Sequence, residues 1–144
     1  MADVAEKNRL ELRVVAPGAA TDKKPYKVQR KADMVIMRCV TGDMGILPGR
    51  VPVSAVLEDG IMRIYDNDTE HRMVVLGGVM HTSDNIVTIL SDTVLKPEEI
   101  NSAELATKIK EFQHLYNETN DLNKKAIYKK DIQRCQVQID AAVK

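Results

Sequence analysis

The sequence predicts an α+β chain in two segments, an antiparallel β-sandwich or barrel followed by a C-terminal αα-hairpin. Residues 1–95 contain short apolar runs with a turn signal about every 8–12 residues, which is typical of antiparallel sheets. After Pro97 there is no glycine, and apolar residues recur at helical spacing. We therefore expect two domains, at residues 1–95 and 96–144.

The composition disfavours several classes of function. Charge is balanced, with 21 basic against 21 acidic residues, and one phenylalanine with no tryptophan offers little surface for stacking bases. Two distant cysteines exclude a disulfide framework and fit a reducing compartment. No run approaches the roughly 18 apolar residues of a membrane span. We expect neither nucleic-acid binding nor direct membrane insertion.

The N-terminal segment is organised around residues 41–52, TGDMGILPGRVP. Its glycines permit positive φ or close backbone approach, and its prolines fix φ. Met44, Ile46, Leu47 and Val51 make it more apolar than a solvated loop. We predict a shaped corner whose apolar side chains insert into the core of this chain or into a partner.

Strands are expected throughout this segment. Residues 10–15 alternate apolar and polar side chains, and after a flexible connection at 17–25, residues 27–31 and 33–40 predict a hairpin. Further hairpin turns are expected at 58–60, 66–68 and 83–85. The remaining strands are expected at residues 52–57, 61–65, 71–76, 79–82 and 86–90.

Some of these strands are apolar on both faces, as at residues 34–37 (MVIM) and 72–76 (RMVVL). A strand with one solvated face would alternate. Each of these strands is therefore either central in the sheet or covered by another chain.

The C-terminal segment has two apolar stripes at helical spacing, with a break at residues 117–121. Asn101 or Ser102 supplies an N-cap. The matching stripes predict that the helices pack as an αα-hairpin. The stripe residues are Leu105, Ile109, Phe112 and Tyr116, then Tyr128, Ile132, Cys135, Ile139 and Ala142.

The sequence offers little for catalysis. It has neither a GxxxxGK[ST] run nor a GxGxxG run. His71, His81 and His114 are not joined by acidic or cysteine residues at metal-ligand spacing. We expect no catalytic residue, no cofactor and no metal.

The second helix carries an excess of positive charge. Residues 121–144 contain six basic against three acidic side chains, a net charge of +3. Pairs four residues apart form ridges on a helix surface. This region is either a solvated face or a docking face for an acidic partner. Its basic residues include Lys124, Lys125, Lys129, Lys130 and Arg134.

GDMGILPGRVP (42–52) followed by LGGVMHTSDNIVTILSD (76–92) resembles the ε subunit of F-type ATP synthases, the equivalent of the mitochondrial δ subunit. That family shows a glycine–acid–x–glycine–aliphatic run ending in Pro-Gly. A Gly-Gly turn follows it, and then a strand ending in Val-Thr-aliphatic-Leu-small-Asp. The resemblance extends along the whole chain and implies a β-sandwich of about ten short strands followed by a helical hairpin.

The resemblance also implies a role. The chain would be a non-catalytic rotor subunit, peripheral at the cytoplasmic face of a bacterial plasma membrane, that couples the catalytic head to the c-ring. Its sandwich would bind the γ subunit, with Gly42, Asp43 and Met44 at the c-ring. Its hairpin would fold on the sandwich, or extend along γ and use its basic residues on the catalytic β subunits to inhibit ATP hydrolysis.

Some bacterial members bind ATP on the hairpin through an Ile/Leu-Asp-x-x-Arg-Ala motif. Here Asn101 stands for the aspartate and Glu104 for the arginine, and Glu111 replaces a further arginine. Two glutamates would repel a triphosphate, so we expect no ATP binding. Two alternatives to the rotor subunit remain: a stand-alone β-sandwich adaptor that binds peptides at a sheet edge, and a small enzyme with an unrecognised site.

Overall fold

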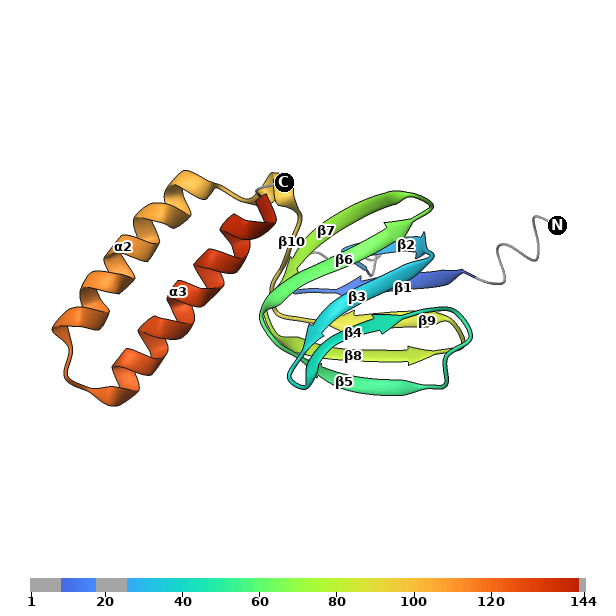
Figure 1. Cartoon of the computed structure of the whole chain (residues 1–144), viewed down its shortest axis with the longest axis horizontal. Coiled ribbons are helices and arrows are strands. Elements are labelled where there is room, and N and C mark those ends of the chain that lie inside the picture. The colour runs from blue at the N-terminus through green and yellow to red at the C-terminus, as the bar shows by residue number, and fades with distance from the viewer. Residues whose placement is uncertain (1–8, 18–25, 143–144) are drawn as a thin grey trace. The chain divides into compact units, whose positions relative to one another are not determined.

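Ten strands, one short 3-10 helix and two α-helices follow one another in the computed structural model, which describes residues 9–17 and 26–142 (Figure 1). The predicted connection at 17–25 lies outside the described residues except for Pro17. The chain divides into two compact units, Met1–Val94 and Leu95–Lys144. The strands are β1 (Leu10–Val15), β2 (Val28–Ala32), β3 (Met34–Cys39), β4 (Gly42–Ile46), β5 (Val53–Leu57), β6 (Gly60–Asp66), β7 (Thr69–Val75), β8 (Gly78–Ser83), β9 (Ile86–Leu90) and β10 (Val94–Leu95). The helices are η1 (Pro97–Glu99), α2 (Ser102–Glu118) and α3 (Leu122–Ala142).

The strands form one continuous sheet, in the order β10-β7-β6-β3-β5-β8-β9-β1-β2, with β4 paired to β3. The sheet folds over on itself, so that β6 and β7 lie in one layer and β8 and β9 in the other (Figure 1). Strand β3 belongs to both layers. Its first half pairs with β6, and Cys39 at its end is opposite Leu57 of β5. The predicted β-sandwich and helical hairpin are confirmed.

The core lies between the two layers and follows the predicted alternation. In β1, Leu10, Leu12 and Val14 are buried while the residues between them are partly exposed. Burying each such aliphatic side chain contributes about 1.5–3 kcal/mol. The other layer and the remaining strands supply Val35, Met37, Met62, Ile64, Met73, Val75, Met80, Val87 and Ile89 to the same core.

The hairpin predicted from residues 27–31 and 33–40 is wrong. Strand β2 pairs with β1, whereas β3 pairs with β4, β5 and β6. Only Asp33 separates β2 from β3, which is shorter than the loop of about two residues in a tight hairpin. The chain therefore turns a corner between layers, and the Asp33 N–H donates to the Tyr65 carbonyl at 2.7 Å.

The hairpin turn predicted at residues 58–60 is also wrong, because β3 lies between β5 and β6 in the sheet. The hairpins at 66–68 and 83–85 are confirmed. Asn67, Asp84 and Asn85 adopt positive φ of 55°, 53° and 62°, a conformation that short polar side chains tolerate in tight turns. The doubly apolar strand at 34–37 is β3, which is central in the sheet as expected.

The second unit is an αα-hairpin, with α2 and α3 side by side (Figure 1). Asn101 is the N-cap of α2, and its Oδ1 accepts a hydrogen bond from the Glu104 N–H at 3.2 Å. Leu105 of α2 and Cys135 of α3 are the buried members of the two predicted stripes. The other stripe residues are partly buried, so the predicted helical faces are confirmed.

Candidate functional site

The glycine-proline stretch is a strand followed by a corner. Val40 and Thr41 form the turn between β3 and β4, and Gly42 opens β4 with φ of 120°, a conformation that favours glycine. Asp43 is exposed, whereas the side chain of Met44 is half-buried and packs against the core. Of the three predicted c-ring residues, Gly42 and Asp43 are exposed and Met44 is half-buried.

The apolar side chains at the end of β4 and in the corner after it divide between the core and the surface. Ile46 is buried in the core of this chain, whereas Leu47 and Val51 are exposed, Val51 by 77%. Two hydrogen bonds shape the corner. The Gly49 N–H donates to Asn85 Oδ1 at 2.8 Å, and Arg50 Nη1 donates to the Gly45 carbonyl at 2.8 Å.

Four exposed aliphatic side chains form a continuous line across the outer face of the β5-β8-β9 layer; we call them the apolar row. Val56 is opposite Val79, and Val79 is opposite Leu90. The Val40 N–H donates to the Val56 carbonyl at 3.0 Å, which extends the line to the end of β3. The four are exposed by 55% (Val40), 54% (Val56), 45% (Val79) and 48% (Leu90).

Polar side chains border the apolar row on each side. Arg38 forms an ion pair with Glu58 at 3.4 Å. Ser54 Oγ lies 2.8 Å from His81 Nδ1. An apolar centre with a polar rim is the usual composition of a protein–protein interface.

Sequence reasoning missed the apolar row. Each member lies next to a buried residue in the sequence, as Val56 does beside Leu57 and Val40 beside Cys39. Alternation alone therefore places it on the outer face. The alignment of the four residues across the strands depends on strand register, which no local pattern supplies.

The basic residues of α3 do not share one surface. Lys125 and Lys129 form one ridge and Lys130 and Arg134 another, about 140° away at about 100° per residue. Lys125 Nζ lies 5.0 Å from the centroid of the Tyr116 ring, a cation–π contact with α2. Within residues 9–17 and 26–142, no salt bridge to Lys124, Lys129 or Lys130 is formed.

The positions compared with the ATP-binding motif have other partners here. Asn101 caps α2, and Glu104 forms an ion pair with Lys108 at 3.5 Å. Glu111 is exposed.

Cys39 and Cys135 are both free and buried. Burial raises the pKa of each thiol. The described part of the chain contains no group of three or more His, Cys, Asp or Glu residues placed to hold a metal ion. None of its helices has the length and apolar character needed to cross a membrane.

Fold and surfaces together define a β-sandwich chain with a helical hairpin and an exposed apolar row. Residues 10–97 match the sequence profile of the family described as ATP synthase, Delta/Epsilon chain, beta-sandwich domain. The chain belongs to this family. The resemblance seen in the sequence is therefore confirmed, and the family assignment favours an ATP synthase subunit over a stand-alone adaptor.

Bacterial relatives support the same assignment. The chain is 33% identical over 95 residues to the ATP synthase epsilon chain of Acinetobacter baumannii, covering 65% of this chain and 68% of that protein. It is 32% identical over 89 residues to the epsilon chain of Rickettsia peacockii, covering 60% of this chain and 80% of that protein.

Solved structures share the fold. A chain in the OSCP/F1/c-ring structure of the Euglena gracilis mitochondrial ATP synthase matches with a TM-score of 0.71 at 21% identity, covering 92% of this chain and 82% of that chain. A chain in the central stalk/c-ring structure of the Tetrahymena thermophila enzyme matches with a TM-score of 0.61 at 14% identity, covering 93% and 96%.

Proposed function

We propose that this chain is a non-catalytic subunit of the central stalk of an F-type ATP synthase. In this role residues 1–95 bind the γ subunit and the c-ring, and residues 96–144 regulate ATP hydrolysis. The subunit is peripheral, at the cytoplasmic face of a bacterial membrane, and couples the catalytic head to the c-ring.

The apolar row is the observation that carries the proposal. Val56 and Val79 are cross-strand neighbours in the middle of a sheet, yet each is about half exposed to solvent. Covering such side chains contributes roughly 25 cal/mol per Å² of apolar surface. We assign the apolar row to the γ interface, and Gly42, Asp43 and Met44 at the β3–β4 turn to the c-ring.

Copurification of the assembled enzyme tests the γ assignment. Val56→Lys places a charge within the apolar row, and it should reduce recovery of the chain with γ and the catalytic subunits. Thr69→Lys is the matched control, because Thr69 is exposed at the start of β7, outside the apolar row and its polar rim. Equal recovery of the two variants would remove the apolar row from the interface. Failure of the unaltered chain to copurify would refute the rotor assignment itself.

The hairpin is assigned a regulatory role by the same proposal. Exposed lysines of α3 would meet acidic segments of the catalytic β subunits when the hairpin extends along γ. The apolar seam between α2 and α3, which includes the buried Leu105 and Cys135, keeps the hairpin paired. No ATP site is proposed, because Asn101, Glu104 and Glu111 do not supply the charges that a triphosphate needs.

A further inference from the structure

Among the described residues, no backbone ladder joins the two layers of the β-sandwich along β2. This strand is at one end of the sheet order, and within residues 9–17 and 26–142 it pairs with β1 alone. It approaches β6 of the other layer, but the two strands are not hydrogen-bonded neighbours in the sheet. The Asp33 N–H bond to the Tyr65 carbonyl joins the two layers at the corner after β2. Further polar contacts that hold this side closed involve side chains.

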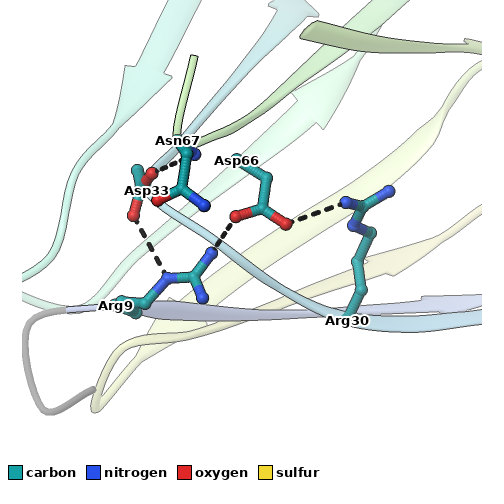
Figure 2. Close-up of polar contacts among 5 residues, drawn as sticks. All are labelled: Arg9, Arg30, Asp33, Asp66 and Asn67. Atoms are coloured by element: carbon teal, nitrogen blue, oxygen red, sulfur yellow. Dashed lines mark hydrogen bonds and ion pairs between the residues drawn. The ribbon is translucent and has the colours of Figure 1, made fainter. Parts of the chain in front are cut away.

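Figure 2 shows a network of four charged residues, together with the Asn67 backbone, that crosses this gap; we call the four charged residues the clasp. Arg9 Nε donates to Asp33 Oδ1 at 3.1 Å, and Arg9 Nη2 donates to Asp66 Oδ1. Arg30 Nη2 of β2 donates to Asp66 Oδ2 at 3.2 Å. The Asn67 N–H donates to Asp33 Oδ2 at 2.6 Å.

The clasp connects segments that are far apart in sequence. Asp66 ends β6, Arg30 lies in β2, and Arg9 directly precedes β1. The four charged side chains are 23–42% exposed, so solvent screens them only in part. Asp66 accepts from both arginines and is therefore the centre of the network.

A second contact closes the same side of the sandwich. Lys27, directly before β2, donates from Nζ to the carbonyl of Val94 in β10. Strands β2 and β10 are the two ends of the sheet order. One side-chain-to-backbone hydrogen bond thus joins the two ends of the sheet, where a closed barrel would have a backbone ladder.

We propose that β2 is a strap: the clasp keeps the sandwich closed along β2, and β2 is the first strand of the sandwich to open. The Arg30 arm is the weaker one. Its Nε is buried without a hydrogen-bond acceptor among the described residues, which costs free energy. Its Nη2 donates one hydrogen bond to Asp66, whereas Arg9 donates hydrogen bonds to both Asp33 and Asp66. Opening begins where Arg30 leaves Asp66, and β1 stays tied through Arg9.

Amide hydrogen exchange of the full chain tests the strap. Asp66→Asn removes the charge at the centre of the clasp and keeps the shape of the side chain. Glu70→Gln is the matched control, since Glu70 also contacts two arginines, Arg63 at 3.6 Å and Arg72 at 3.5 Å, but all three belong to the β6–β7 hairpin. We expect about tenfold faster exchange of the β2 amides in Asp66→Asn, and less than about twofold in Glu70→Gln.

Three outcomes would overturn the strap. Equal exchange of β2 in the two variants, a uniform increase over all strands, or faster exchange confined to β6 and β7 would each show that the clasp does not hold β2. If Asp66→Asn fails to fold, Arg30→Gln, which breaks only the weaker arm, takes its place with the same expectation for β2. The measurement uses the purified chain, so its result is independent of the proposed rotor function.

Discussion

The ammonium group of Lys125 in α3 lies over the ring of Tyr116 in α2, with Nζ 5.0 Å from the ring centroid. This lysine therefore contributes to the pairing of the two helices, unlike the exposed Lys124, Lys129 and Lys130. Removing the charge of Lys125 should change the stability of the hairpin, whereas removing the exposed lysines should change binding to a partner. Mutations can therefore separate the two roles.

The exposed lysines are predicted to inhibit ATP hydrolysis. Replacing Lys124, Lys129 and Lys130 together by alanine should raise the hydrolysis rate of the purified complex and leave synthesis and assembly nearly intact. One exposed ion pair contributes only about 0–1 kcal/mol, so single replacements should have little effect. Inhibition by the native chain should weaken as salt rises, because charges are screened over about 8–10 Å.

Two controls sharpen this measurement. Lys110→Ala removes an exposed lysine from α2 and should leave hydrolysis unchanged. Lys125→Met removes the contact with Tyr116 and should lower the melting temperature of the hairpin. An equal hydrolysis rate for the triple variant and the native complex would identify these lysines as an ordinary solvated face.

Gly78 is predicted to be intolerant of any side chain. Its φ is 119°, and a Cβ there would lie 2.2 Å from the Leu90 carbonyl oxygen. Gly78→Ala should therefore reduce the free energy of unfolding by about 2–5 kcal/mol in urea titrations. At Gly45 the nearest atom to an added Cβ is Ile36 Cγ1 at 3.9 Å. Gly45→Ala is the control, with an expected change of about 0.5 kcal/mol, and equal effects of the two would contradict the prediction.

The c-ring assignment of the β3–β4 turn is testable by cross-linking. Burial raises the pKa of the Cys39 and Cys135 thiols, so at neutral pH both remain protonated and react slowly. Asp43→Cys therefore introduces the reactive thiol without removal of the native cysteines. We expect cross-links from it to the polar loops of the c-ring.

Asp68→Cys is the control, because Asp68 is exposed in the β6–β7 turn, next to the opposite end of β3. Cross-links from position 43 to the catalytic head alone, or equal c-ring cross-linking from both positions, would refute the placement of Asp43.

ATP binding by the isolated chain is predicted to be absent at micromolar concentrations. Glu104 and Glu111 repel a triphosphate, and the Asn101 side chain is used as the cap of α2. Titration calorimetry checks this directly, and a micromolar dissociation constant would contradict it. Combining Asn101→Asp, Glu104→Arg and Glu111→Arg should create binding heat if these positions alone prevent it.

The sequence was sufficient for most elements of the fold but not for their pairing. Alternation in β1 predicted the buried Leu10, Leu12 and Val14, and the helical stripe predicted the buried Leu105. Both signals are local and report which side of an element is apolar. The single residue Asp33 and the turn at 58–60 look like ordinary turn signals, yet each carries the chain between layers. Whether a turn closes a hairpin or connects the two layers depends on pairing with strands that are distant in sequence.

Of the candidate surfaces, those made of consecutive residues were visible in the sequence, and those assembled from separate segments were not. The motif around Asp43 was visible because its residues are consecutive. The apolar row was not, because Val40, Val56, Val79 and Leu90 come from four separate segments. Arg30 and Asp66 of the clasp are 36 residues apart and meet only after the sandwich closes.

Strand β4, which carries Asp43, is bonded to β3 along five residue pairs, and β3 is in turn bonded to both β6 and β5. A sideways force applied to Asp43 therefore enters both halves of the sandwich through backbone hydrogen bonds, without passing through a flexible loop. Because of this pairing, Asp43 cannot be displaced independently of the sheet. A force on Asp43 therefore moves the sandwich as a rigid unit.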